Sequence, residues 1–250
     1  MEQQSPNERR LEDWMRTYGT AILRTCFVIL SDAREAEDAM QDTFLRAWRA
    51  MDTFEQRNGA SVKTWLMRIA INVCRDYQRK RWFRHIDMRH ALEDLPQGMM
   101  TVLPEDRELM LDILRLPDDL KNPLILYYYQ DMNLQETADA LGISKSTVHT
   151  RLKKAEQALK LSLTGGDCLS DKLKRVLDTN LAGLHVTDAQ VNAVLRRVSQ
   201  DEKRPRVIRW QAIAAVLLVL VLGAGSCCKP GFCRTIPRSS LPTSPVRAIS

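Results

Sequence analysis

Apolar side chains recur at helical spacing through most of the chain. In LEDWMRTYGTAILRTCFVIL, residues 11–30, they fall three or four positions apart, which is the period of one face of an α-helix. Residues 33–51 and the segment that starts at residue 62 repeat this pattern, and Asp32 is a suitable cap for the second helix. An Asn-Gly turn signal makes residues 52–61 a predicted loop. Because no run of β-branched residues alternates with polar ones, an all-α fold is predicted.

A second helical unit is expected over residues 105–161. Residues 83–104, between the two units, contain two prolines and a glycine and are predicted to form a flexible linker. The second unit begins with apolar residues, among them the run Tyr127–Tyr129. Aromatic rings can stack on bases, but we expect these three to pack beneath the small helical domain.

Residues 134–159 contain the signals of two short helices around a glycine. Asn133 and Glu136 have the spacing of a capping box, in which each side chain bonds the other's backbone N–H. Gly142 suits the left-handed conformation that ends many helices, and Ser144 can cap the helix that follows. This arrangement is typical of a helix-turn-helix.

The second of these helices has one apolar and one polar face. The apolar face consists of Val148, Leu152, Ala155 and Leu159. The opposite face consists of Ser146, Thr150, Lys153 and Gln157, with His149 and Lys154 at its edges. This outward face contains no carboxylate, since Glu156 lies nearer the apolar edge. Lys and Arg would bind phosphates, and the smaller polar groups can read base edges, so we predict that the helix enters a DNA major groove. A plain helical hairpin with a solvated face is the alternative.

Charge is unevenly distributed along the 250 residues, although the net charge is only +6. Residues 31–42 are acidic, with Asp32, Glu35, Glu37, Asp38 and Asp42 against Arg34 alone. Residues 61–90 are basic, with Lys63, Arg68, Arg75, Arg79, Lys80, Arg81, Arg84 and Arg89 against Asp76 and Asp87. Two patches of opposite sign indicate two different partners.

The C-terminal part begins with two short amphipathic helices, predicted within residues 171–199. Thr187 and Gln190 form a second capping-box pattern there. Trp210–Cys228 then contains no charged residue, and its length matches the ~20 residues that a helix needs to cross a bilayer. We therefore predict a transmembrane helix, with a buried core helix as the alternative. The tail beyond it is rich in Pro and Ser and is predicted to be disordered.

Three segments resemble bacterial RNA polymerase sigma factors. AEDAMQDTFLRAW resembles their core-polymerase-binding helix, and KTWLMRIAINVCRDYQRKR resembles the helix that reads the promoter −10 element. The segment from LPDDLKNPL to KKAEQAL resembles the domain that reads the −35 element. Their order and spacing resemble the extracytoplasmic-function (ECF) group of the sigma-70 family, over roughly residues 8–161.

The resemblance implies two small helical domains and a domain order along the chain. These domains are sigma region 2 at residues 8–82, the linker at 83–104, and the region 4 helix-turn-helix at 105–161. A juxtamembrane helical segment at 162–209, the membrane helix at 210–228 and the disordered tail at 229–250 complete the prediction.

The resemblance also assigns residues to three binding sites. Core-polymerase binding is expected at Asp38, Gln41, Asp42, Phe44, Leu45 and Trp48, although Phe44 is equally suited to the core. Binding of the −10 element is expected at Asn58, Lys63, Arg68, Asn72, Arg75, Arg79, Lys80 and Arg81. Binding of the −35 element is expected at Lys145, Ser146, Thr147, His149, Thr150, Arg151, Lys153, Lys154 and Gln157. The family usually has Lys where this chain has His149, which puts the −35 sequence in doubt but not the fold.

No catalytic function is expected. The sequence has no Gly-rich phosphate loop, no activated nucleophile and no Cys/His cluster with zinc spacing, so we predict neither an enzyme nor a metal or cofactor site. The expected partners are core RNA polymerase, through its largest-subunit clamp coiled coil and its flap, and promoter DNA. An anti-sigma factor is a further candidate.

The expected function is a sigma factor tethered to the membrane and regulated by stress or another signal. Its DNA-binding part would lie in the cytoplasm, with a single C-terminal span and the N-terminus inside. Cys227, Cys228 and Cys233 would then lie at or beyond the outer face, where a disulfide can form. Two alternatives are a membrane-bound helix-turn-helix regulator that does not bind polymerase, and a sigma-like decoy or self-inhibited scaffold.

Overall fold

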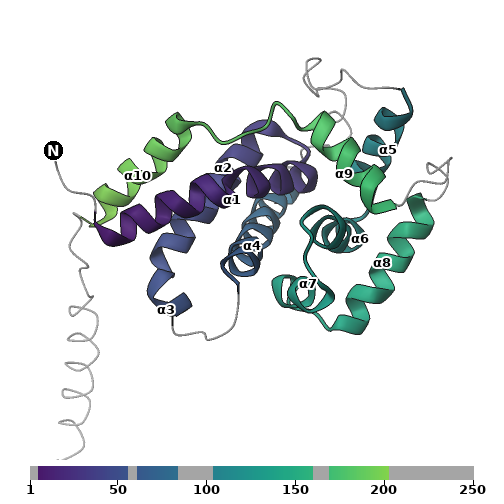
Figure 1. Ribbon diagram of the computed structural model, residues 1–250, viewed down its shortest axis with the longest axis horizontal. Coiled ribbons are helices and arrows are strands. Elements are labelled where there is room, and N and C mark those ends of the chain that lie inside the picture. Colours follow the sequence, from purple (N-terminus) through teal and green to yellow (C-terminus); the bar gives the residue numbers. More distant parts are fainter. Residues whose placement is uncertain (1–4, 56–60, 84–103, 160–168, 203–250) are drawn as a thin grey trace, which may run out of the picture. The chain divides into compact units, whose positions relative to one another are not determined.

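A computed structural model describes residues 5–55, 61–83, 104–159 and 169–202 (Figure 1). All of them belong to one compact unit, Met1–Lys203, and every regular element among them is helical. The all-α prediction is therefore confirmed for the described residues.

The first group of helices comprises α1 (Pro6–Leu30), α2 (Ala33–Arg49), α3 (Met51–Glu55) and α4 (Val62–Phe83). Ser5 and Glu8 form a capping box at the start of α1. Ser31 ends that helix with a left-handed φ of 55°, and the Asp32 side chain caps α2 by accepting from the backbone N–H of Glu35 at 2.8 Å.

The predicted loop at residues 52–61 begins later than expected, because α3 extends to residue 55. Phe54 explains the difference. Its ring contacts those of Trp14 and Trp65, with centroid distances of 6.0 and 4.6 Å, so packing against α1 and α4 holds residues 51–55 in a helical turn.

Helices α1, α2 and α4 pack against one another around an apolar core. The helical periodicity of the sequence accounts for the buried positions, since Phe27 of α1, Phe44 of α2 and Leu66 of α4 are all enclosed. Cys26 and Cys74 are free thiols in this core. A hydrogen bond with Cys74, together with burial, raises the pKa of Cys26 well above its usual value, which suits an unreactive structural thiol.

The second group comprises α5 (Pro104–Arg115), α6 (Asp118–Leu124), the π-helical turn η3 (Ile125–Tyr129), α7 (Leu134–Leu141) and α8 (Lys145–Leu159). The tyrosines of η3 are half-buried, and Tyr128 donates to Glu156 of α8 at 2.6 Å. As predicted, they pack within the helical domain.

The caps predicted for the helix-turn-helix are present. Asn133 accepts from the N–H groups of Gln135 and Glu136, and the Glu136 carboxylate accepts from the N–H of Asn133 at 2.8 Å. Gly142 has a φ of 69°, which an L-residue rarely adopts. Ser144 accepts from the N–H of Thr147 at 3.2 Å.

Two further helices follow, α9 (Leu169–Asn180) and α10 (Asp188–Glu202). Their existence was predicted, and so was the capping box of Thr187 and Gln190. From the sequence alone, we predicted that they form a juxtamembrane helical segment. In the structure, α9 packs on η3 and α5, whereas α10 packs on α1 and α2.

Three predictions fall on residues outside the described ranges: most of the linker at 83–104, the span at 210–228 and the tail at 229–250. Within the described ranges, no helix combines the length and the apolarity that crossing a bilayer requires. The span at 210–228 therefore stays a prediction.

Candidate DNA and polymerase interfaces

One face of α4 has the cationic character expected of a DNA contact. Leu66, Val73 and Cys74 are buried against α1 and α2, and this fixes which residues point outward. The outward residues that the structure exposes are Arg68, Asn72, Arg75, Arg79 and Lys80. Five of the eight predicted −10 contacts are therefore accessible on one helix.

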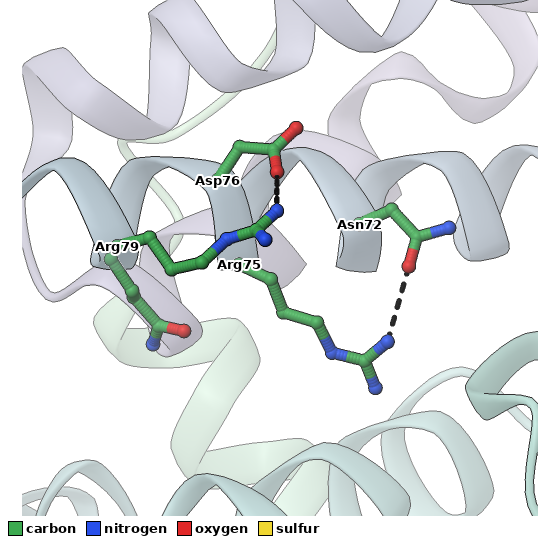
Figure 2. Close-up of a pocket in the computed structure, with 5 residues that line it drawn as sticks. Asn72, Arg75, Asp76 and Arg79 are labelled. Carbon is green, nitrogen blue, oxygen red and sulfur yellow. Dashed lines mark hydrogen bonds and ion pairs between the residues drawn. The ribbon is translucent and has the colours of Figure 1, made fainter.

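Part of this face is hollowed into an open pocket of about 660 Å³, lined by Asn72, Arg75, Asp76, Gln78 and Arg79 (Figure 2). Arg75 donates to the Asn72 side chain at 3.1 Å, and Arg79 pairs with Asp76. The arginine ends remain exposed, so the pocket is suited to phosphate groups.

Asp76 is a carboxylate within this cationic face, and its sequence context indicates no role for it. Arg46 of α2 pairs with it at 2.9 Å, in addition to Arg79. Partial burial raises the pKa of Asp76, but the hydrogen bonds from the two arginines outweigh it and leave that pKa below its usual value. Asp76 therefore stays ionised and neutralises part of the positive charge.

Arg81 differs from the other predicted −10 residues because it is buried, with 8% exposure. Its guanidinium donates to the carbonyl of Leu30 at 2.8 Å and pairs with Glu35 at 2.6 Å. These contacts tie the end of α4 to the α1–α2 corner. The prediction that Arg81 contacts DNA does not fit this geometry, since a phosphate cannot reach an enclosed guanidinium.

Lys63 lies at the start of α4 and is half-buried. Its ammonium donates to the backbone carbonyl of Gln130, which follows η3 in the second group of helices. Further along α4, Gln78 donates to Asp118 of α6 at 2.7 Å. The structure thus brings α4 against the helix-turn-helix group, and α4 also packs on α7. Neither contact has a local signal in the sequence, because the partners are far apart along the chain.

The predicted polymerase-binding residues of α2 divide between surface and core. Asp38 is exposed, whereas Gln41, Asp42, Leu45 and Trp48 are half-buried. Phe44 is fully buried, which favours the interpretation of this residue as core. Asp42 accepts from the Tyr77 hydroxyl at 3.1 Å, and burial, followed by the charge of Asp42, raises the pKa of Tyr77. The tyrosine therefore holds this carboxylate in place at the surface.

The outward face of α8 is as the sequence predicted. Lys145, Ser146, His149, Thr150, Lys153, Lys154 and Gln157 are exposed, and Thr147 and Arg151 are half-buried. Buried Val148, Leu152, Ala155 and Leu159 fix this orientation. Thr150 donates to the carbonyl of Ser146 at 2.9 Å, so that hydroxyl is oriented along the helix. Among the described residues, α8 has no salt bridge.

Two further predictions concern Asn58 and metal binding. Asn58 lies outside the described residues, so its role at the −10 element stays a prediction. Among the described residues, no three His, Cys, Asp or Glu side chains are placed to hold a metal ion.

Comparison with protein families gives two matches. Sigma-70 region 2 matches residues 14–84 and sigma-70 region 4 matches residues 113–161. The first match contains the α2 and α4 faces, and the second contains the helix-turn-helix. Two such regions in this order define a sigma factor of the sigma-70 family. Helices α9 and α10 lie beyond both matches.

Similar proteins identify the group within that family. The chain is 32% identical over 165 residues to the ECF RNA polymerase sigma factor SigW of Bacillus subtilis, which covers 60% of this chain and 87% of SigW. It is 29% identical over 168 residues to the RNA polymerase sigma-E factor of Streptomyces coelicolor, covering 66% of this chain and 92% of that protein. The chain belongs to the ECF group of the sigma-70 family of RNA polymerase sigma factors.

A solved structure agrees in fold. It is the sigma factor RpoE of Bartonella quintana in complex with the anti-sigma factor NepR, with a TM-score of 0.50 and 21% identity over 62% of this chain and 97% of RpoE. At this level of identity the similarity concerns the fold alone.

Proposed function

We propose that this sigma factor binds core RNA polymerase through α2 and directs it to promoters that it reads with α4 and α8. The observation that carries the proposal is the outward face of α8. It presents hydroxyl, imidazole, amide and ammonium groups on a capped helix-turn-helix, and no carboxylate interrupts it. A face without carboxylates avoids repulsion from phosphates, which dominate the affinity for DNA.

On α8, the proposal separates groups that read bases from groups that hold the backbone. Ser146, His149 and Gln157 have donors and acceptors suited to base edges in a major groove. Lys145, Lys153 and Lys154 would bind phosphates and so set the register of the helix on the duplex. His149 is the residue most suited to give this chain its own −35 preference, because a neutral imidazole both donates and accepts.

On α4, Arg68, Arg75, Arg79 and Lys80 would hold the phosphates around the −10 element, with the pocket beside Asn72 as a binding site for one of them. Arg81 is left out of this set, because its guanidinium binds the Leu30 carbonyl and Glu35 within the protein. Asn58, in the loop predicted before α4, would contact an extruded base, whose unstacking costs a few kcal/mol that nearby cations must offset.

For core polymerase, the exposed carboxylate of Asp38 and the half-buried Leu45 and Trp48 would form the contact on α2. Apolar side chains at the centre of an interface commonly contribute most of its binding energy, and charges at its edge speed association. An anti-sigma factor is a further proposed partner, supported by the RpoE–NepR complex.

We also propose that the uncharged segment at 210–228 anchors the protein in the cell membrane, with the DNA-binding part in the cytoplasm, until a stress or other signal releases it. Fractionation of cells before and after stress tests this. A full-length protein found wholly in the soluble fraction would exclude the anchor.

The first test of the function is transcription by core polymerase from a library of random promoters, with the full chain and with a chain that ends at residue 161. Transcripts are sequenced. Defined start sites behind a shared −35 and −10 pair establish a sigma factor. Core binding without transcripts from either chain favours the decoy, and absence of core binding favours a stand-alone regulator.

A matched pair of variants makes this test specific to α8. Lys153→Ala removes an exposed charge from the proposed DNA face, and Arg9→Ala removes an exposed charge from α1. The proposal expects weaker promoter binding for the first variant only. Equal effects would show that net charge, rather than the α8 face, drives binding.

A further inference from the structure

Helices α9 and α10 lie outside both sigma-70 regions, and each packs on a different one. The apolar face of α9, made of Leu173, Val176 and Leu177, is fully buried. Helix α9 contacts α5 and η3 of the second group of helices, which we call the region 4 group; the first group is called the region 2 group. A single helix of 12 residues is marginal in water, so this docking is what stabilises α9.

Helix α10 packs on α1 and α2 of the region 2 group. Val191, Val194 and Val198 are buried in this contact. Polar contacts mark both ends of the helix. Ser199 donates to Glu8 at 2.7 Å, and Arg16 pairs with Asp188 at 3.0 Å. The C-terminal segment therefore contacts both sigma regions at once.

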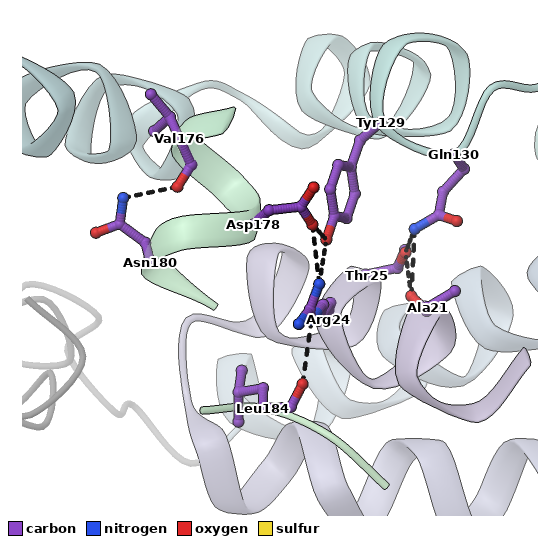
Figure 3. A network of polar contacts seen from close by, with 9 residues as sticks. All are labelled: Ala21, Arg24, Thr25, Tyr129, Gln130, Val176, Asp178, Asn180 and Leu184. Carbon is purple, nitrogen blue, oxygen red and sulfur yellow. Dashed lines mark hydrogen bonds and ion pairs between the residues drawn. The ribbon is translucent and has the colours of Figure 1, made fainter. Parts of the chain in front are cut away.

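One guanidinium joins the two regions and this segment (Figure 3). Arg24 of α1 donates to Asp178 of α9 at 2.9 Å, to the Tyr129 hydroxyl of η3 at 3.1 Å and to the carbonyl of Leu184 at 3.1 Å. Tyr129 in turn donates to Asp178 at 3.0 Å. Gln130 adds a direct contact between the regions by donating to Thr25 of α1 at 3.1 Å. Opening the regions would break the bonds that cross to α1, namely those of Arg24 and the bond from Gln130 to Thr25.

The connection between α9 and α10 lies close to the backbone of α1 at Gly19. A Cβ atom at Gly19 would approach Cγ2 of Val186 to 2.9 Å, closer than side chains pack. The backbone N–H of Val186 donates to Thr20 at 3.3 Å. Glycine is otherwise unfavourable inside a helix, so its presence here fits the close approach of residues 181–187.

This closed arrangement is incompatible with promoter binding as proposed above. By their nominal positions, the −35 and −10 elements lie about 25 base pairs apart, which is roughly 85 Å at 3.4 Å per base pair of B-form DNA. In the structure α7 packs on both α4 and α8, so the two DNA-reading helices are separated by little more than one helix. Lys63, a predicted −10 contact, is also bound to Gln130.

We propose that α9, α10 and the connection 181–187 form an inhibitory clamp that holds regions 2 and 4 in a closed state, so that the chain contains its own inhibitor of promoter binding. The proposal rests on the proposed function as a sigma factor. The clamp must undock before α4 and α8 can separate, and any signal that acts on the C-terminal part can act through this step.

The first experiment undocks the clamp in the full chain, held in detergent micelles and mixed with core polymerase. Leu177→Asp with Val194→Asp places a carboxylate in each buried contact, whereas Thr179→Asp with Asn192→Asp adds the same charges to the exposed sides of the same helices. The first pair should increase promoter-specific transcription at least tenfold, and the control pair should leave it unchanged.

A second variant should open the clamp through a substitution in α1, so that the residues of the clamp itself stay unchanged. Gly19→Ala should favour the helical conformation of α1, but its Cβ collides with Val186. We expect increased transcription from Gly19→Ala and a return to the wild-type level when Val186→Ala is added, because the second change removes the colliding Cγ2 methyl group.

A third variant locks the clamp. The distance from the Gly19 Cβ position to the Val186 Cβ is 3.5 Å, which lies within the range of disulfides. Gly19→Cys with Val186→Cys, in a background in which Cys168, Cys227, Cys228 and Cys233 are serine, should be inactive when oxidised and active after reduction. The single-cysteine variants control for unspecific oxidation.

Spin labels at Thr17→Cys of α1 and Ala158→Cys of α8, both exposed, report opening directly. In the same serine background, the undocked pair should broaden the distance distribution and shift it to longer values.

If the regions open but transcription equals that of wild type, or if the oxidised lock stays active, the clamp is not inhibitory. A different outcome would exclude the proposed sigma function itself: opened variants that bind promoters and core polymerase no better than wild type, and none of which directs transcription. The inhibitory role of the clamp would then be excluded as well.

Discussion

The two helices proposed to read DNA differ in how much of their polar surface the protein itself uses. On α4, Lys63 bonds Gln130, Arg79 pairs with Asp76, and Arg81 is enclosed beside Glu35. On α8, the predicted contacts are almost all exposed. Both helices carry a cationic face in the sequence, yet a larger share of that face is exposed on α8 than on α4. Cationic patterning therefore identifies a surface suited to DNA, but tertiary contacts decide which of its charges are free to bind.

The largest effect should come from comparing Arg81→Ala with Arg75→Ala on the same helix. Removing Arg81 leaves Glu35 and the Leu30 carbonyl without this donor in a largely enclosed site, so we expect a loss of about 3 kcal/mol in the free energy of unfolding. Arg75 is exposed, and its removal should change stability by less than ~0.5 kcal/mol. Urea unfolding followed by circular dichroism measures both. Similar losses would show that Arg81 is not the structural residue of the pair.

On α8, His149→Ala should change sequence preference rather than general affinity. Loss of a base contact costs about 1–3 kcal/mol of discrimination, so preference at one −35 position should fall by roughly 5- to 150-fold. Promoter selection with the holoenzyme, followed by sequencing, measures it.

Lys153→Ala is the contrasting variant on the same face. It should weaken binding to all promoters alike and reduce the slope of log affinity against log salt by about 0.9. A changed base preference for Lys153→Ala, or none for His149→Ala, would reverse the roles proposed for these residues.

A substitution in the turn before α8 should have a smaller effect, which is on the stability of the fold. Gly142 has a φ of 69° and an open surrounding, so Gly142→Ala should cost about 1 kcal/mol through backbone strain alone. Gly183 is equally open but has no such φ, and Gly183→Ala should change stability by less than ~0.5 kcal/mol. Thermal unfolding of the two variants side by side measures the difference. Equal midpoints would indicate that Gly142 is not required for the turn.

The smallest effect concerns the carboxylate on α4. Because the pKa of Asp76 is depressed in the folded protein, its contribution to stability is present above the pKa of the unfolded chain and is lost as pH falls through the folded pKa. Its partners are largely exposed, so Asp76→Asn should cost only about 0.5 kcal/mol at pH 7. Unfolding measured from pH 7 to pH 3 should show this difference shrinking as pH falls below about 4.

The same variant also tests the difference between the two helices. Without Asp76, the charges of Arg46 and Arg79 are no longer neutralised, and −10 DNA binding should strengthen and become more salt-dependent. Unchanged DNA affinity would mean that Asp76 does not limit the positive charge of α4.

Local patterns in the sequence predicted much of this molecule. Caps at Asp32, Asn133 and Ser144, the left-handed Gly142 and the inward stripe of α8 were all correct, because each depends on residues within four positions of one another. The exposed residues of α4 follow from the same periodicity. The short helix α3 was missed because Phe54 is held by aromatic rings from distant parts of the chain.

The sequence by itself determined the helices, the polar faces of α4 and α8 and membership of the ECF sigma factors, since these follow from side-chain period, cap spacing and motif order. Only the tertiary structure decided which cations are buried or paired and where α9 and α10 dock. The bonds of Arg24 to Tyr129 and Asp178 join residues more than 100 positions apart. Such contacts depend on how whole helices pack, and no local pattern specifies them.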